Sequence, residues 1–392
     1  DTLELLIDPA ALNLVGQLPY TSSLNDIWGY TDVNGNEFAL LGLQDGVSIV
    51  DIATDPPTEI HRIAGVSTTW RDLKTWGNYA YVINEAPNGG GLLIIDLTGL
   101  TTNPLTSTIV TYTRDFGVGY TDCHNIFIDE NGAGYLFGAT CSANPPGQTT
   151  NRGTLFIDIA SNPTNPAYLG MYPQNIIGSN DTYIHDGFVR GDTMWASHIY
   201  GGTFGVIDVS NKAGTFSTTN GTILALQPTP GNFTHACWLT DDGNTLAVVD
   251  ETGGNNGLGI NTYDVSNLNN IIHLDNIQSK PGTNVVPHNV FIKGDFVVAS
   301  YYTSGVVIVD ISDPSNTVIV EDYDTSPNSG NGFAGCWGTY PFFPSGTIIA
   351  SDRQQGLFVF EAECQYASRI EGTVTDQTTG QPIIGATIDV LN

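Results

Sequence analysis

The most constraining feature of this 392-residue chain is a short apolar strand that ends in an acidic residue and occurs seven times. The first copy is GVSIVDI, which contains Asp51, and a late copy is GVVIVDI, which contains Asp310. An internal repeat restricts the fold to an array of one supersecondary unit, because each unit needs its neighbours to bury its apolar face. The acidic residues of the seven copies are Asp51, Asp96, Asp158, Asp208, Asp264, Asp310 and Glu361.

A glycine-centred hairpin turn has the same count and a similar period. Strand-like runs flank each turn, as in HNVFIKGDFVVASYY around Gly294. Each unit of about 50 residues then holds four antiparallel strands, which is typical of a β-propeller blade. We therefore predict an all-β, seven-bladed β-propeller over residues 1–366. The turn glycines are Gly35, Gly77, Gly132, Gly191, Gly243, Gly294 and Gly346.

The two ends of the chain carry separate predictions. The seventh unit runs out after GLFVFEAE, so the N-terminal strand LNLVGQLP (12–19) is expected to complete the last blade. This pairing would close the ring and remove two free sheet edges. Residues 367–392 lie beyond the last repeat.

Charge and composition exclude several classes of function. The chain has 40 acidic and 11 basic residues, a formal net charge of −29 at pH 7. Phosphate binding needs clustered cations, so neither a nucleic acid nor an anionic membrane surface is expected as a partner. No apolar run is long enough to span a bilayer, and direct membrane insertion is not expected.

The five cysteines are compatible with an oxidising compartment. Cys123 and Cys141 flank a segment centred on the turn residue Gly132, so in a hairpin they would face each other. A disulfide and a pair of buried thiols both remain open for these two residues.

Histidines are concentrated at one position of the repeat. Inner strands line the channel of a propeller, and their first residues lie at one mouth, so a histidine there faces the channel entrance. Arg71 is in register with this position, and Asn25 and Ala334 complete the expected ring. The four histidines, from four consecutive blades, are His124, His185, His235 and His288.

Neutral imidazole is a common ligand of zinc, copper and iron, so we predict a transition-metal site at this mouth. The expected metal ligands are His124, His185, His198, His235, His288 and Glu251. The residues expected to bind another ligand there are Arg71, Glu85, Tyr301, Asp352 and Arg353.

Other interpretations of these polar residues stay open. A repeat copies its structural residues, so each histidine would then only bond a loop of the neighbouring blade. The seven repeat acids are expected to be structural, because an aspartate at a strand end accepts backbone N–H bonds in an Asx-turn. Calcium is a second predicted cofactor, at acidic turns such as Asp241-Asp242-Gly243.

The repeated strand, with its apolar residues before an aspartate, resembles the LVIVD repeat. The span 10–365 is similar to the choice-of-anchor B family of secreted bacterial β-propellers. The tail from Arg369 to Val390 resembles the start of a carboxypeptidase regulatory-like domain, a small β-sandwich of which only two strands fit. The resemblance implies that residues 367–392 form a linker and a truncated β-sandwich-like segment. These resemblances imply export and cell-surface attachment, and they imply no established reaction. The start at Asp1 also favours a processed mature protein.

Two classes of function remain open from the sequence. The first is a secreted, cell-surface module for binding, adhesion or structural assembly. Its partner would be a surface protein, a glycan or a small ligand, and its C-terminal strands would support self-assembly. The alternative is a metal-dependent enzyme that uses the histidines at the channel mouth. That arrangement is similar to the selenium-binding protein and methanethiol oxidase propellers, which use histidines and a metal.

Overall fold

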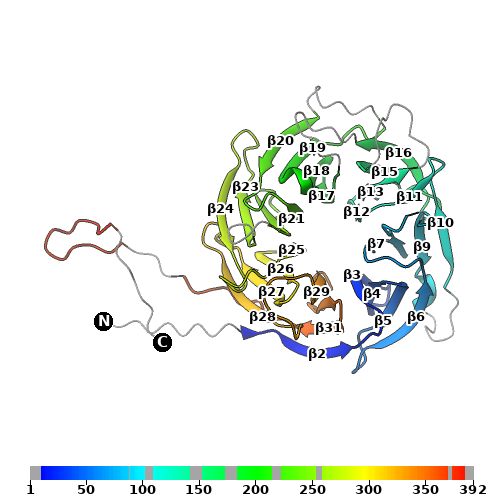
Figure 1. The fold of residues 1–392 in the computed structure, drawn as a ribbon, viewed down its shortest axis with the longest axis horizontal. Coiled ribbons are helices and arrows are strands. Elements are labelled where there is room, and N and C mark those ends of the chain that lie inside the picture. The colour runs from blue at the N-terminus through cyan, green and yellow to red at the C-terminus, as the bar shows by residue number, and fades with distance from the viewer. Residues whose placement is uncertain are drawn as a thin grey trace.

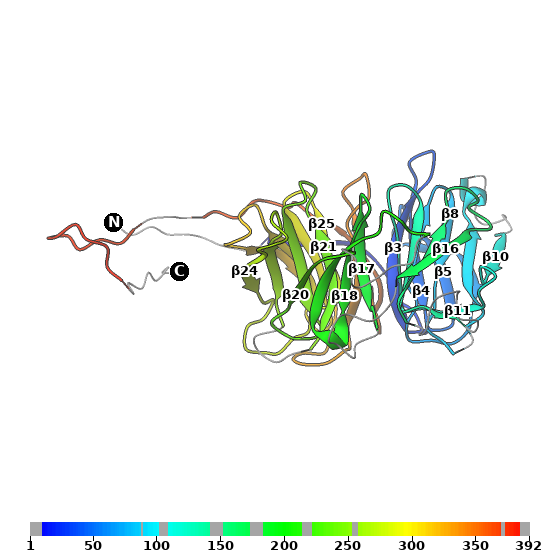
Figure 2. The ribbon, with the colours of Figure 1, turned by 90° about the horizontal axis from the view of Figure 1, so that it is seen from above.

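The computed structural model describes residues 10–87, 89–101, 109–141, 152–172, 183–213, 222–252, 258–369 and 373–384. Seven blades, each with four antiparallel strands, are arranged in a ring (Figure 1), and Figure 2 shows the ring edge-on. The predicted all-β, seven-bladed propeller is confirmed. Among the described residues, no helix is long and apolar enough to cross a membrane.

Each blade runs from an inner strand at the channel to an outer strand at the rim (Figure 1). Blades 1 and 2 contain β3 (Leu24–Thr31), β4 (Glu37–Leu43), β5 (Gly46–Asp51), β6 (Thr58–Ala64), β7 (Leu73–Trp76), β8 (Tyr79–Val82), β9 (Leu92–Asp96) and β10 (Thr111–Arg114). Blades 3 and 4 contain β12 (Asn125–Ile128), β13 (Ala133–Phe137), β15 (Thr154–Asp158), β16 (Ala167–Tyr172), β17 (Asp186–Arg190), β18 (Thr193–His198), β19 (Thr203–Asp208) and β20 (Ile223–Pro228).

The remaining blades follow the same order. Blades 5 and 6 contain β21 (Thr234–Leu239), β22 (Thr245–Asp250), β23 (Ile260–Asp264), β24 (Ile272–Ile277), β25 (Val290–Lys293), β26 (Phe296–Tyr301), β27 (Gly305–Asp310) and β28 (Val318–Tyr323). Blade 7 contains β29 (Cys336–Tyr340), β30 (Ile348–Asp352), β31 (Gly356–Glu361) and β2 (Asn13–Leu18). Shorter elements are β1 (Ala10–Ala11), β11 (Tyr120–Asp122), β14 (Thr140–Cys141), η1 (Thr98–Thr101) and η2 (Ile199–Gly201).

The N-terminal strand closes the ring as predicted. β2 pairs antiparallel with β31, from Asn13 opposite Glu361 to Leu18 opposite Leu357, and so forms the outer strand of blade 7. Just before it, β1 pairs in parallel with β28 on the outer edge of blade 6. The N-terminus therefore links the last two blades and leaves no unpaired outer strand in blade 7.

The repeated residues have the structural roles expected of them. All seven turn glycines have positive φ values, between 49° and 88°, a region that glycine adopts at little cost. The six repeat aspartates each accept a backbone N–H two or three residues further on. For example, Asp264 Oδ1 accepts the Ser266 N–H at 2.9 Å. The seventh acid, Glu361, instead accepts a bond from the Asn13 amide of the closing strand at 3.4 Å.

Apolar clusters between adjacent blades hold the inner strands in place. Between blades 1 and 2, for example, Ile49 and Leu73 are fully buried in one cluster. Val249 and Val307 are buried in the cluster between blades 5 and 6. Because interiors are close-packed, these contacts fix the angle between neighbouring sheets. The first residues of the inner strands are thereby held at defined positions around one mouth.

The segment after the last blade runs along blade 6. Tyr366 donates a hydrogen bond to Asp295, and Arg369 forms an ion pair with the repeat acid Asp310 at 3.0 Å. Residues 373–384 form a turn with one bridge, between Thr375 and Pro382, outside the ring (Figure 1). The boundary at 366 and the β-sandwich assignment of 367–392 stay predictions, and residues 370–372 and 385–392 lie outside the described residues.

The cysteine pair forms no disulfide. Cys123 and Cys141 are both buried free thiols. Cys141 lies opposite Tyr120 in the β11–β14 ribbon, because this ribbon extends past the β12–β13 hairpin with its own register. The Tyr120 hydroxyl donates a hydrogen bond to the Cys123 sulfur at 3.0 Å. Of the two alternatives left open by the sequence, the buried thiols describe the structure.

Candidate metal centre at the channel mouth

The first positions of the inner strands form a ring at one mouth, with one difference from the predicted register. Cys336 lies opposite Asp352 in blade 7 as Thr234 lies opposite Asp250 in blade 5. The next residue in each blade is therefore equivalent, so Trp337 takes the place expected for Ala334. The ring consists of Asn25, Arg71, His124, His185, His235, His288 and Trp337.

The four ring histidines lie side by side in one arc. Successive ring centroids from His124 to His288 are 4.0, 4.2 and 4.3 Å apart. Trp337 continues the arc, 4.5 Å from His288. The repeat thus brings four predicted ligands together, from blades 3 to 6. His198 is not among them.

Two of these imidazoles are anchored through Nδ1. His185 Nδ1 bonds the His235 carbonyl at 3.1 Å, and His288 Nδ1 bonds the Trp337 carbonyl. A carbonyl oxygen only accepts, so in the neutral ring Nδ1 carries the proton and Nε2 keeps its lone pair. Metal-binding histidines are commonly oriented in this way. The same bonds satisfy the structural interpretation of the histidines, so the two interpretations are compatible.

Burial keeps the inner histidines neutral. His185, His235 and His288 are at most 4% exposed. Desolvation, aided by repulsion between neighbouring imidazoles, holds the pKa of each well below its usual 6.5. At neutral pH these rings are therefore in the form that binds metals.

Glu251 completes a group with metal-binding spacing. One ligand atom each from His235, Glu251 and His288 lie within 4.8 Å of one another. The Glu251 carboxylate oxygens are 3.8 Å from His235 Nε2 and 4.0 Å from His288 Nε2. These separations are too long for hydrogen bonds. A tetrahedral ion with bonds of about 2.1 Å sets its ligands roughly 3.4 Å apart, so a small inward movement would suffice.

Glu251 is also oriented by a tyrosine. The Tyr302 hydroxyl donates a hydrogen bond of 2.6 Å to one carboxylate oxygen. Burial nevertheless raises the pKa of Glu251 above its usual value. A buried carboxylate with a raised pKa gains from a nearby positive charge, and a bound cation would supply one.

At the other end of the arc, Glu85 and His124 form a closed pair. Glu85 Oε2 and His124 Nδ1 are 2.6 Å apart, and the Tyr183 hydroxyl donates to the second oxygen at 3.1 Å. Burial alone would raise the pKa of Glu85. The bonds and charges of His124, Tyr183 and Arg152 outweigh burial and lower it.

A cavity of about 660 Å³ lies over the arc. Its volume is in the range of small-molecule sites. Its lining includes all four ring histidines together with Glu85 and Glu251. The aromatic residues in its wall are Trp70, Tyr183, Tyr200, Phe233 and Trp337.

Three predicted site residues lie inside the blades and do not line this cavity. Tyr301 is fully buried and donates to the Ile277 carbonyl at 3.3 Å. Asp352 is buried and accepts the backbone N–H of Gln354 at 2.9 Å. His198 is buried at the end of β18, and neither of its ring nitrogens has a hydrogen-bond partner among the residues that the structure describes. Desolvation lowers the pKa of His198 to about 4.

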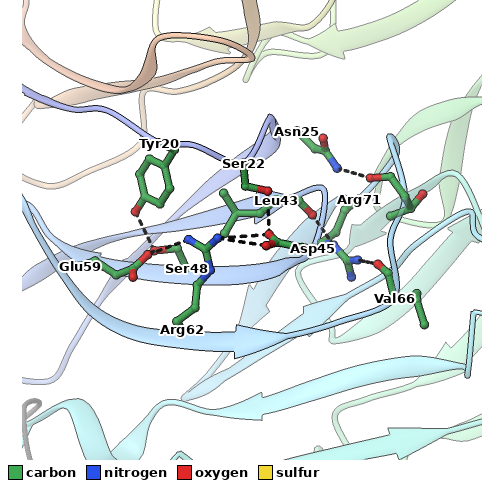
Figure 3. A network of polar contacts seen from close by, with 11 residues as sticks. Tyr20, Ser22, Asn25, Leu43, Asp45, Ser48, Glu59, Arg62, Val66 and Arg71 are labelled. Carbon is green, nitrogen blue, oxygen red and sulfur yellow. Dashed lines mark hydrogen bonds and ion pairs between the residues drawn. The ribbon is translucent and has the colours of Figure 1, made fainter.

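Arg71 and Arg353, which were predicted to bind a ligand, make contacts within the protein. Arg71 donates to the carbonyls of Leu43 and Val66 at 3.0 and 2.6 Å, beside the Asp45–Arg62 ion pair (Figure 3). Burial lowers the pKa of Arg71 to about 10. Arg353 lies over the Trp337 ring at 5.1 Å. Both guanidinium groups therefore have contacts that hold blades and loops together.

The sequence did not single out a second ring, one residue deeper in the channel. Asp26, Asp72 and Asp186 line it, and the Lys74 ammonium bonds Asp72 at 2.7 Å. Burial raises the pKa of Asp26 to about 7. The signal for it in the sequence is the acid or amide that follows most ring positions, such as Asp26 after Asn25. Burial also raises the pKa of Asp186 well above its usual value, and Asp72 is paired with Lys74, so this ring is a buried acidic cluster with one ammonium group.

Comparisons with known proteins agree with this architecture. The family model described as LVIVD repeat matches residues 69–109 and 287–325, so the resemblance to that repeat is confirmed for these two segments. They contain Glu85 of blade 2 and Tyr302 of blade 6. No curated protein matches the chain. The choice-of-anchor B and carboxypeptidase regulatory-like assignments stay predictions.

Solved structures show the class of fold. The chain is similar to the β-propeller domain of Myceliophteria thermophila Cps50 (Swd1), with a TM-score of 0.59 and 15% identity over 90% of this chain and 99% of that one. It is also similar to the Neurospora crassa Pan2 WD40 domain, with a TM-score of 0.59 and 10% identity over 91% of this chain and 97% of that one. At such low identity the likeness concerns the fold alone. The protein is thus a seven-bladed β-propeller in which two segments match the LVIVD repeat.

Proposed function

We propose that this propeller binds a divalent transition metal ion at its channel mouth through His235, His288 and Glu251, and that the ion helps to hold a ligand in the cavity above. The observation that carries the proposal is the convergence of their three ligand atoms within 4.8 Å. Two imidazoles and one carboxylate suit zinc, iron or copper. A propeller with LVIVD repeats suggests a binding or structural module, and the proposal specifies what this module binds.

Metal analysis of the purified chain tests the proposal. After growth in metal-replete medium, elemental analysis should find one transition metal ion per chain. His235→Ala and Glu251→Gln should each lose it. His273→Gln is the matched control, because His273 is on the outer strand β24 and bonds Asn261 at 3.0 Å. A metal-free wild-type chain, or full metal content in both site variants with intact folding, would contradict the proposal.

A metal-dependent enzyme is the second candidate. It is favoured by the number of protein ligands, because three ligands leave a coordination position open, as in catalytic zinc sites. That position would face the 660 Å³ cavity. Calcium binding, export, cell-surface display and self-assembly through the C-terminal strands stay predictions from the sequence.

A further inference from the structure

Arg152 brings a cation to the wall of an otherwise acidic cavity. Its side chain is 54% exposed, and its nearest acid oxygen is Glu85 Oε1, 3.9 Å away. Both Glu85 oxygens are already bonded, to His124 and to Tyr183. Within the described part of the chain, the guanidinium has one further side-chain contact, the Tyr183 ring at 5.4 Å. As far as the described residues show, most of its five N–H donors are therefore available to a ligand.

The backbone holds Arg152 in an unusual conformation. Its φ angle is +89°, which is uncommon for a residue other than glycine. The Arg152 N–H bonds the Ala139 carbonyl at 2.7 Å, and its own carbonyl accepts the Ile184 N–H at 3.2 Å. Such strain persists only where the surroundings fix it, and it is frequent at ligand sites. Two bonds to other segments thus set where the arginine side chain begins.

An aromatic wall leads from Arg152 toward the proposed metal ligands. The Tyr183 ring, on which the guanidinium lies, is 5.7 Å from the Tyr200 ring. Tyr200 is in turn 5.8 Å from Phe233, which directly precedes β21 and its ligand His235. A flat apolar body packed on this wall would have a cation at one end and the metal group at the other.

We propose that the cavity takes a small aromatic carboxylate. Its carboxylate pairs with Arg152, its ring packs on Tyr183, Tyr200 and Phe233, and a second oxygen at the far end of the ring reaches the metal ion. Arginine and carboxylate form paired hydrogen bonds of matching geometry. In a chain with a net charge of −29, most of the surface disfavours an anion, so the two positive ends make this cavity selective. The contact of this ligand with the metal ion rests on the proposed function, whereas its contact with Arg152 does not.

Three probes that share a phenol ring and differ in the group opposite its hydroxyl test the inference on the full chain. Zinc-loaded protein is titrated in a calorimeter with 4-hydroxybenzoate, 4-hydroxybenzamide and 4-hydroxybenzylamine. The benzoate should bind at least about tenfold more tightly than the amide, because the amide cannot form a charged hydrogen-bonded pair with Arg152. The amine should bind most weakly, because its positive charge would be repelled by Arg152. Arg152→Gln should remove the preference for the benzoate. Arg114→Gln is the matched control, because Arg114 lies over the Tyr112 ring at 5.4 Å on the outer strand β10.

The outcomes separate the two proposals. Equal binding of the benzoate and the amide, tighter binding of the amine, no binding of any probe, or an unchanged preference in Arg152→Gln would each overturn the carboxylate inference. Zinc content is measured on the same samples. A chain that binds no zinc contradicts the proposed function alone, since the preference for the carboxylate over the amide is then measured on the metal-free chain and still depends on Arg152.

Discussion

Two glutamates stand at the same position of the repeat, and their surroundings make them chemically different. Glu85 follows the second strand of blade 2, and Glu251 follows the second strand of blade 5. Each accepts a tyrosine hydroxyl and lies beside a ring histidine. Glu85 forms a 2.6 Å bond to His124, whereas Glu251 is 3.8 Å from one imidazole and 4.0 Å from the next.

The difference comes from how many histidines each glutamate meets. His124 is the first member of the arc, so Glu85 meets one imidazole and closes on it. Glu251 lies between two imidazoles and is too far from either for a hydrogen bond. In the closed pair the carboxylate is already bonded to an imidazole, while an open group of three ligands has room for an ion at its centre. One repeat position thus yields a structural pair in one blade and a candidate binding site in another.

The largest effect should come from exchanging each glutamate for its amide. Glu251→Gln should weaken zinc binding by about a hundredfold or more, because it removes a charged ligand. Glu85→Gln should leave zinc affinity within about threefold, because the closed pair takes no part in coordination. Competition with a chelator of known affinity measures both. Equal losses in the two variants would mean that the open and closed groups act as one site.

The sequence predicted the arc because hairpin turns fix the register of inner strands. His185 and His288 each precede their turn glycine by six residues, and His124 and His235 by eight. In blade 7 the expected position was Ala334, 12 residues before Gly346, whereas Trp337 occupies it, 9 residues before Gly346. The loop between β29 and β30, residues 341–347, is longer than the hairpin loops of the four histidine blades. Turn spacing therefore transfers between blades only where hairpin loops have similar lengths.

Tyr301 and Asp352 were predicted to bind a ligand but do not line the cavity, for a different reason. Successive residues of a strand point in opposite directions. At the strand ends, Asp250 points into its blade, where it accepts the Gly231 N–H at 2.9 Å, while Glu251 lines the mouth. Tyr301 and Asp352 hold the inward position of their blades, and sequence alone does not tell which of two neighbours faces the channel. Arg152 belongs to a long connection without a repeat position, so no pattern marked it.

A second, smaller effect should come from the tyrosines that orient the two carboxylates. Tyr302→Phe should weaken zinc binding about tenfold, in line with the loss of one outer bond to a metal ligand. Tyr183→Phe removes the corresponding bond to Glu85 and should leave zinc affinity unchanged. The same chelator competition applies. A loss in Tyr183→Phe as large as that in Tyr302→Phe would place Glu85 in the metal site and remove the distinction between the two groups.

The smallest effect concerns the metal-free protein, where the two glutamates should change stability in opposite directions. The pKa of Glu85 is lowered in the folded chain, so its charge stabilises the fold above the usual carboxyl pKa of 4.5, and this contribution is lost as pH falls through the lowered value. The pKa of Glu251 is raised by burial, so its contribution is present below 4.5 and is lost as pH rises through the raised value. At pH 7 with a chelator present, Glu85→Gln should lower the free energy of unfolding by about 1 kcal/mol, and Glu251→Gln should raise it by a similar amount.

Urea unfolding at pH 7 and again near pH 4 measures both, and the two differences from wild type should shrink at the lower pH. A loss of stability in both variants at pH 7 would mean that Glu251 is already compensated without an ion, which would remove the reason for this open group to bind one.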